Sequence, residues 1–160
     1  MNRIAQFFKV DLTEYLKDGK KEDFDDILLP RRATSGSAGY DFYAPFDMFL
    51  NSGETVKIPT GIRVKIDEGW VLKIYPRSSL GFKYRLTLNN TVGIIDSDYY
   101  YADNQGHIFI KMTNLGTEPL SIKKGSAFAQ GVFVEYGITL DDEPISNVRK
   151  GGFGSTDKKD

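Results

Sequence analysis

Two carboxylates and a tyrosine follow a short apolar run in the segment Gly93-Ile94-Ile95-Asp96-Ser97-Asp98-Tyr99. A carboxylate within hydrogen-bond reach of a water can orient that water and accept its proton, so Asp96 is a candidate general base. The same residue types also suit an ordinary turn, because Asp and Ser side chains bind turn backbone. Taken alone, the segment favours the turn. Just upstream, Asn89-Asn90 predicts a tight hairpin turn whose free backbone groups could bind the edge of a base.

A second segment, Pro76-Arg77-Ser78-Ser79-Leu80-Gly81, has the residue types of a phosphate-binding turn. It follows an alternating stretch and is expected to open a short helix. Backbone N–H groups, two hydroxyls and a guanidinium would then lie together, which suits a phosphate. A serine N-cap beside an exposed arginine is the plainer interpretation, and these residues alone favour it.

The third candidate is the glycine-rich stretch Arg149-Lys150-Gly151-Gly152-Phe153-Gly154-Ser155-Thr156 near the C-terminus. A linker does not need a phenylalanine between its glycines. A lid does, because the ring can stack on a base while the polar groups bind phosphates and water is excluded. The lid and the linker are equally supported by the residues alone.

Short alternating segments provide the elements that must position these residues. Apolar and polar side chains alternate with a period of two over residues 62–66, 70–75 and 108–112, which predicts half-buried strands. Glycines separate these runs as turn signals: Gly53, Gly61, Gly69, Gly93, Gly106, Gly116, Gly125 and Gly137. Many short strands with regular turns predict an all-β antiparallel sandwich or barrel.

One short helix is expected near the N-terminus, with Asp11 as its cap, Glu14 completing a capping box and Gly19 ending it. The charged stretch from Lys17 to Asp26 predicts a solvated surface excursion. The end of the chain, from Lys150 to Asp160, lacks apolar periodicity and is expected to be mobile without a ligand.

The composition excludes several classes of protein and site. A length of 160 residues with 40% apolar side chains fits one domain with a real core. The balance of 21 Lys plus Arg against 22 Asp plus Glu argues against a nucleic-acid binder. There is no cysteine, and His107 is the single histidine, which excludes thiolate and multi-histidine metal sites. No apolar run approaches the roughly 20 residues of a membrane span, and no signal-peptide pattern is present, so a soluble cytoplasmic protein is expected.

Read in order, these segments resemble the five motifs of the trimeric dUTPase family. The resemblance fits a phage member or a bacterial member of this family. Any single motif is weak, but five in this order are specific, and the resemblance covers roughly residues 29–156. The matching segments are Ser37–Asp41 introduced by Leu29–Thr34, then Pro76–Gly81, Asn90–Tyr99, Ala129-Gln130 after Gly125, and Gly151–Thr156.

The resemblance implies a jelly-roll subunit, a homotrimer with three shared active sites, and Mg²⁺-assisted hydrolysis of dUTP to dUMP and pyrophosphate. A β domain would span residues 1–148, with 11–27 as an insertion unusual for the family, and 149–160 would form a flexible lid. Asp96 would hold the attacking water and act as base. Tyr99 would pack under the deoxyribose, and Asn90 with the backbone up to Gly93 would bind uracil.

The remaining roles implied by the resemblance concern the triphosphate and the lid. Mg²⁺ would be held by phosphates and waters rather than by direct protein ligands. Asp41 would support the water shell of the metal or the arginine of the second motif. The other residues would contact substrate: Arg77, Ser78, Ser79 and Gln130 on the phosphates, Arg149 on the γ-phosphate with Ser155 beside it, and Phe153 over the uracil ring.

The sequence departs from the family pattern in four places. A longer hairpin is expected from Tyr100 to Gln105, and Ala127 stands where the fourth motif commonly has arginine. Arg149 is one residue closer to the glycines than usual, so Lys150 could replace it. The stretch from Asp11 to Ile27 has no family counterpart.

Two alternatives remain open at this point. A dCTP deaminase would share the fold and the Arg-Ser-Ser-Leu segment, but it would need a glutamate where this chain has Lys111. A phage relative that uses the scaffold to bind a regulatory partner protein is the second alternative. The surfaces for such a partner would be Asp11–Leu16 and the Tyr100-Tyr101 pair.

Overall fold

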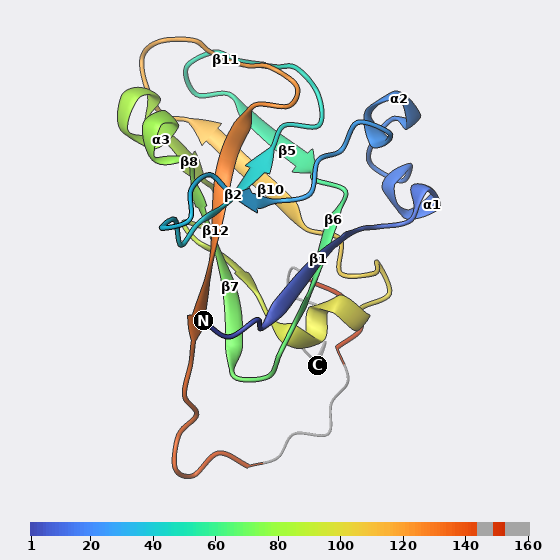
Figure 1. Cartoon of the computed structure of the whole chain (residues 1–160). Helices are drawn as coiled ribbons and strands as arrows, with labels where there is room; N and C mark the ends of the chain where they lie inside the picture. The colour runs from blue at the N-terminus through green and yellow to red at the C-terminus, as the bar shows by residue number, and fades with distance from the viewer. Residues whose placement is uncertain (144–148, 153–160) are drawn as a thin grey trace, which may run out of the picture.

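The computed structural model describes residues 1–143 and 149–152. Short strands dominate this part of the chain (Figure 1). The strands are β1 (Ala5–Lys9), β2 (Arg31–Arg32), β3 (Tyr40–Tyr43), β4 (Met48–Leu50), β5 (Thr55–Pro59), β6 (Ile62–Ile66), β7 (Trp70–Pro76), β8 (Leu86–Leu88), β9 (Gly93–Ile95), β10 (Phe109–Asn114), β11 (Leu120–Ile122) and β12 (Ala127–Glu135). The helices are α1 (Leu12–Tyr15), α2 (Lys21–Phe24), α3 (Ser78–Tyr84) and the 3₁₀ helix η1 (Ser97–Tyr101). The all-β expectation is confirmed.

The largest sheet has the strand order β2-β3-β12-β7-β9, with every neighbouring pair antiparallel. Its long central pair joins β12 to β7 from Ala129 opposite Pro76 to Glu135 opposite Trp70. A second sheet has the order β5-β10-β8, and the remaining strands form two two-stranded sheets, β1-β6 and β11-β4. In Figure 1, α3 lies on one side of these strands and α1 with α2 on the other.

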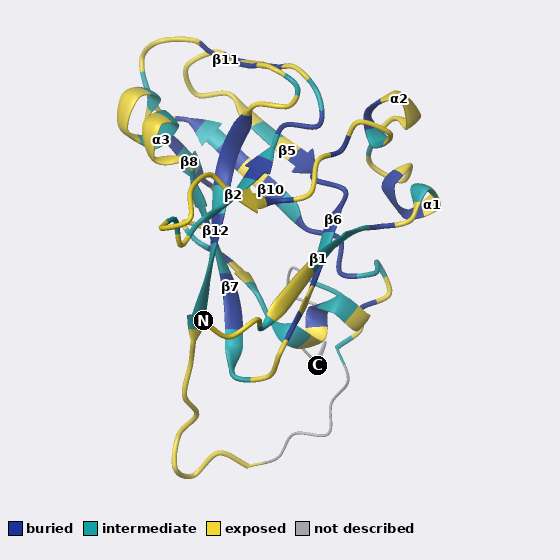
Figure 2. Ribbon diagram, in the orientation of Figure 1, coloured by how far each residue is buried: buried dark blue, intermediate teal, exposed yellow. Residues whose placement is uncertain are grey.

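The core follows from the alternation seen in the sequence. In β6, Ile62, Val64 and Ile66 are buried, while Arg63 is half-buried and Lys65 is exposed. Figure 2 shows that buried residues concentrate in the strands and that the helices and connecting loops are more exposed. Full burial of one such side chain stabilises the fold by about 1.5–3 kcal/mol, so the alternating strands, rather than the one-turn helices, hold the fold together.

The N-terminal helix is shorter than the capping pattern predicts, and the predicted capping box is wrong. Helix α1 is a single turn, and its N-cap Asp11 makes no side-chain cap bond. The Asp11 carboxylate instead accepts a hydrogen bond from Gln105 Nε2 at 3.0 Å, and Glu14 pairs with Lys17. A local cap and a distant partner compete for the same carboxylate, and here the distant partner prevails.

The stretch from Lys17 to Asp26 is not the fully solvated excursion that its charges predict. It contains the helical turn α2, in which Asp23 is buried beside Lys124 at 3.6 Å. The next apolar residue, Ile27, is also buried. The excursion therefore packs on the β domain, since a buried carboxylate becomes acceptable when a lysine from another element lies beside it.

Both predicted hairpins differ in the structure. Asn89-Asn90 does form a tight turn, closed by the Thr91 N–H donating to Leu88 O at 3.0 Å. However, β8 on one side of this turn pairs with β10, and β9 on the other side pairs with β7. The expected longer hairpin over Tyr100–Gln105 is wrong, because this stretch continues η1 and then turns back toward β10. Its residues lack the alternation that strand pairing requires.

Among the described residues, no helix is long and apolar enough to cross a membrane. His107 is a polar side chain in the interior of the molecule and is 0% exposed. Its Nε2 accepts a hydrogen bond from the Gly61 N–H at 2.9 Å. Burial lowers the pKa of His107 to about 4, against the opposing effect of the Glu14 and Asp18 carboxylates.

This lowered pKa predicts acid sensitivity between pH 6.5 and about 4. In that window the unfolded chain binds a proton at His107 and the folded chain does not, so stability is full above pH 6.5 and falls as the pH is lowered. The loss reaches at most about 3 kcal/mol. Thermal unfolding of wild type and His107→Gln at a series of pH values should show a steeper loss for wild type. Parallel curves for the two proteins would contradict the prediction.

Candidate active site

A cavity of about 240 Å³ opens between the turn after β8, the strand β9 and the helix η1. Its walls combine apolar strand residues with several residues that the sequence singled out. The lining residues are Ile74, Leu88, Asn90, Val92, Gly93, Ile94, Ile95, Tyr99, Phe109, Ile110, Arg149 and Gly152. Within one chain, the structure thus brings together Asn90, Gly93, Tyr99 and Arg149.

Tyr99 forms the aromatic wall of this cavity and is only 5% exposed. Its hydroxyl donates to the His107 carbonyl at 2.7 Å and accepts from Asn104 Nδ2 at 2.8 Å. Burial raises the pKa of Tyr99, so the phenol stays protonated at neutral pH. Gly152 lies against the ring, because a Cβ built there would be 3.1 Å from Tyr99 Cε2. The backbone of the C-terminal segment therefore passes directly over this wall.

Asp96 occupies the N-cap position of η1, directly after Ile95, a lining residue of the cavity. Its side chain is not among the lining residues, but it is bonded to Arg149, which is. Arg149 Nη2 donates to Asp96 Oδ2 at 2.6 Å, and Arg149 Nε forms an ion pair with Asp98 Oδ1 at 2.8 Å. Both carboxylates keep about half of their side-chain surface exposed, at 45% for Asp96 and 57% for Asp98. Asp96 can therefore meet a water molecule and a guanidinium at the same time.

The segment expected to bind phosphates forms a separate cluster at the other end of β7. Strand β7 ends at Pro76 and the predicted short helix, α3, begins at Ser78. The predicted serine N-cap is wrong, because Arg77 occupies the N-cap position and no side chain caps the helix. Gln130 Nε2 donates to Pro76 O at 3.3 Å and to Ser78 Oγ at 3.2 Å. Asp41 lies directly opposite Gln130 in the β3–β12 pair, and Ser79 is exposed beside Ser78.

One chain does not bring these two groups of residues together. Leu72 of β7 faces Ile95, the residue before Asp96, while Pro76 lies four residues further along β7. At about 3.3 Å per strand residue, roughly 13 Å of strand separate the two positions. Asp41, Arg77, Ser78, Ser79 and Gln130 are all absent from the walls of the cavity. Phe153 and Ser155 lie outside the described residues.

Sequence reasoning missed two groups of residues around the cavity. Asn104, His107 and Asp98 hold Tyr99 and Arg149 in place, and no local spacing identifies them as partners. Ile74 and Phe109, which form apolar parts of the lining, were predicted as strand residues but not as cavity residues. They meet at the cavity because β7 pairs with β9 and because the chain turns after β8.

The carboxylates of Asp96 and Asp98 fit Mg²⁺ only as supporting groups for an ion that substrate phosphates and waters mainly hold. No group of three or more potential metal-ligating side chains occurs within residues 1–143 and 149–152. Asp96 and Asp98 supply two carboxylates, both already paired with Arg149. Mg²⁺ keeps several waters and binds readily through substrate phosphates with one or two carboxylates in support, which these residues could provide.

Comparison with known proteins assigns the fold and the motifs to one family. A family model described as dUTPase matches residues 25–157. The deoxyuridine 5′-triphosphate nucleotidohydrolase of Lactococcus lactis is 44% identical over 132 residues, covering 81% of this chain and 88% of the relative. The dUTPase crystal structure from Streptococcus mutans superposes with a TM-score of 0.65 at 34% identity, covering 83% of this chain and 97% of that one.

A more distant structure shows the fold alone. It is a mutant dUTPase from phage phi11 of S. aureus, described with a structural Mg(II) ion, and it superposes with a TM-score of 0.64 at 19% identity. The superposition covers 91% of this chain and 98% of the phage protein.

Proposed function

Because the chain belongs to the dUTPase family, we propose that it hydrolyses dUTP to dUMP and pyrophosphate. The observation that carries this proposal is a cavity that joins Asn90, Gly93, Tyr99 and Arg149, with Asp96 bonded to Arg149. The relatives named deoxyuridine 5′-triphosphate nucleotidohydrolase support the same reaction. The deaminase alternative is not proposed, because Lys111 replaces the glutamate that it requires.

The cavity has the chemistry to recognise a deoxyuridine. Uracil presents a donor between two acceptors, a pattern that the Asn90 amide and the backbone of the turn up to Gly93 can match. The buried ring of Tyr99 forms part of the cavity wall and would pack under the deoxyribose, where it would exclude an additional ribose hydroxyl. Discrimination then arises from steric exclusion and from polar groups that a wrong base would leave unpaired.

Asp96 acts as the general base in this scheme. Its carboxylate accepts a proton from a water as the water oxygen attacks the α-phosphorus, and the bond from that phosphorus to the bridging oxygen breaks to release pyrophosphate. Bound Mg²⁺ would neutralise phosphate charge, with Asp41 in support of its water shell. Arg149 leaves Asp96 for the phosphates, so the guanidinium stabilises the carboxylate before catalysis and the triphosphate during it.

We infer a homotrimer in which neighbouring subunits complete each site. The distance between the cavity and the Ser78–Gln130 cluster supports this arrangement, because a triphosphate bound in one chain's cavity would need phosphate ligands that the same chain holds elsewhere. Arg77, Ser78, Ser79 and Gln130 would come from a second subunit. The segment 149–160 would act as a lid, with Phe153 over the base and Ser155 on the phosphates, and the rest of the chain, 1–148, as the β domain.

Light scattering of the nucleotide-free protein tests the assembly. We expect a mass near three times the 18.0 kDa of one subunit. A mass near one subunit together with full activity would contradict the shared site.

Chelation and product analysis test the proposed reaction. With dUTP and Mg²⁺, the products should be dUMP and pyrophosphate in equal amounts, and EDTA should remove most of the turnover until Mg²⁺ is restored. Release of inorganic phosphate with dUDP, or turnover unchanged by EDTA, would contradict the scheme.

Since the proposed substrate is a nucleotide of the cell interior, we infer that this activity takes place in the cytoplasm.

A further inference from the structure

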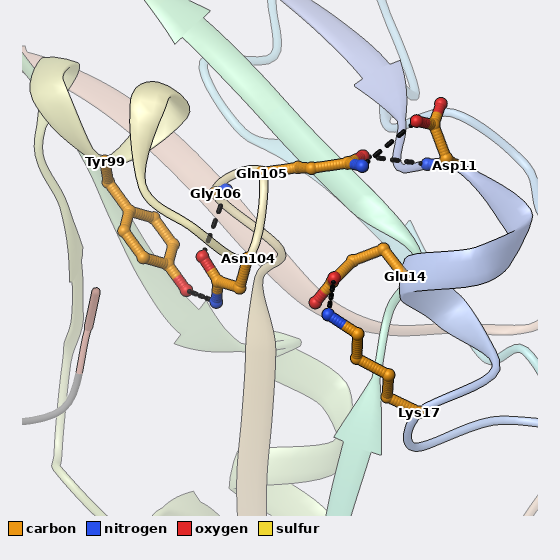
Figure 3. A network of polar contacts seen from close by, with 7 residues as sticks. All are labelled: Asp11, Glu14, Lys17, Tyr99, Asn104, Gln105 and Gly106. Carbon is orange, nitrogen blue, oxygen red and sulfur yellow. Dashed lines mark hydrogen bonds and ion pairs between the residues drawn. The ribbon is translucent and has the colours of Figure 1, made fainter. Parts of the chain in front are cut away.

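The loop from Ala102 to Gly106 contacts three parts of the molecule: Tyr99, the start of α1 and the backbone of Lys150. It follows η1 in the stretch where this sequence is longer than the family pattern. In Figure 3, Asn104 points toward Tyr99 and Gln105 points the other way, toward Asp11. The backbone N–H of Asp103 also donates to Lys150 O at 2.9 Å, next to Arg149.

The Asn104 amide uses both of its ends. Its Nδ2 donates to the Tyr99 hydroxyl at 2.8 Å, and its Oδ1 accepts from the Gly106 N–H at 3.1 Å. The same hydroxyl donates to the His107 carbonyl at 2.7 Å. Two bonds with opposite direction therefore fix the phenol oxygen, and with it the ring that lines the cavity.

The backbone of the loop has a conformation that needs such support. Gln105 has a φ of 59° and Gly106 a φ of 71°, both in the left-handed region. A side chain at Gly106 is excluded, since a Cβ there would lie 2.6 Å from Tyr99 O. A left-handed non-glycine residue costs roughly 1–2 kcal/mol, and persists only where neighbouring contacts hold it.

Gln105 supplies one of those contacts through a reciprocal pair with Asp11. Gln105 Nε2 donates to Asp11 Oδ2 at 3.0 Å, and the Asp11 N–H donates to Gln105 Oε1 at 3.0 Å. The two residues are 94 positions apart in sequence. This pair attaches the start of α1, in the N-terminal stretch without a family counterpart, to the loop that holds Tyr99.

We propose that Asn104 is a positioning residue that orients Tyr99 for the selection of deoxyribose over ribose, and that the Gln105–Asp11 pair braces it. The proposal rests on the function proposed above and adds a residue to it. Asn104 acts through the Tyr99 hydroxyl and does not touch substrate itself. A ring that can rotate or retreat would open space for the ribose hydroxyl, so selectivity should suffer more than turnover of dUTP.

The test compares kcat/KM for dUTP and UTP in a double-mutant cycle. Asn104→Ala should lower the dUTP/UTP ratio roughly tenfold, the value of one lost hydrogen bond to a buried partner, mainly through faster UTP hydrolysis. Tyr99→Phe should lower the ratio at least as much, and adding Asn104→Ala to it should change nothing further. Asn51→Ala, in an exposed turn remote in sequence from the loop, is the matched control and should retain the wild-type ratio.

Further variants distinguish the positioning role of Asn104 from a general loss of folding. Gln105→Ala should reduce the ratio by a smaller factor, about threefold, while the protein melts near the wild-type temperature. An unchanged ratio in Tyr99→Phe would overturn the proposal even if Asn104→Ala fails to fold. An additive effect of Asn104→Ala in the Tyr99→Phe background would also overturn it. If wild type does not hydrolyse dUTP, the proposed function itself fails, which this series distinguishes from a failure of the positioning role.

Discussion

Replacing Asp96 by asparagine is expected to remove most of the turnover of dUTP, by a factor on the order of 10²–10⁴, because it removes the proton acceptor. The side chain keeps its shape, and the position follows a strand that pairs with β7, so the fold should be unchanged. Binding of an α,β-imido analogue of dUTP, measured by calorimetry, should stay within a few-fold of wild type. Steady-state pyrophosphate release measures the loss of turnover.

Asp98→Asn is the matched control for this substitution. Asp98 also forms an ion pair with Arg149, at 2.8 Å, but its side chain is more exposed than that of Asp96, at 57% against 45%. Its replacement should therefore be milder than that of Asp96. If the two variants exchanged severity, the base would be Asp98 and the assignment of Asp96 would be wrong.

Removing residues 149–160 is expected to lower kcat/KM for dUTP by about 10³-fold or more, while the protein remains folded. The loss of a positioned arginine alone costs about this much in phosphoryl transfer. The core contains no residue from the described part of this segment, 149–152, so the melting temperature without ligand should match that of wild type. The truncated protein should also gain little thermal stability from the dUTP analogue.

Single substitutions identify which cation carries the effect. Arg149 lines the cavity and pairs with Asp96. The side chain of Lys150 is exposed, and its backbone carbonyl accepts a hydrogen bond from the Asp103 N–H. Arg149→Ala should reproduce most of the truncation, and Lys150→Ala should have a small effect. Near-normal turnover of the truncated protein would show that the segment is a linker and not a lid.

The strands and the cavity residues could be predicted because they depend on local pattern. The alternation over residues 62–66 and 70–75 reappears as β6 and β7, since a period of two places one set of side chains on the core face. The turn at Asn90 and the ring of Tyr99 were expected from the order of the motifs, and both line the same cavity.

The N-terminal helix and the loop after Tyr99 could not be predicted in the same way. The spacing of Asp11 and Glu14 indicates a capping box, but Asp11 binds Gln105 across 94 residues. The charged residues between Lys17 and Asp26 indicate a solvated stretch, but Asp23 is buried beside Lys124. In each case a partner distant in sequence determines the role of the charged side chain, and residue spacing carries no information about that partner.

The measurement that tests the central proposal most directly is pyrophosphate release by the wild-type protein from dUTP, dCTP, dTTP and UTP, side by side with Mg²⁺. Recognition through Asn90, Gly93 and Tyr99 predicts rapid release from dUTP and very slow release from the other three nucleotides. In the proposed scheme, the amino group of cytosine would present a donor where the turn expects an acceptor, and the methyl group of thymine and the ribose hydroxyl would be excluded sterically. Comparable release from UTP, or release of ammonia from dCTP, would contradict the assignment.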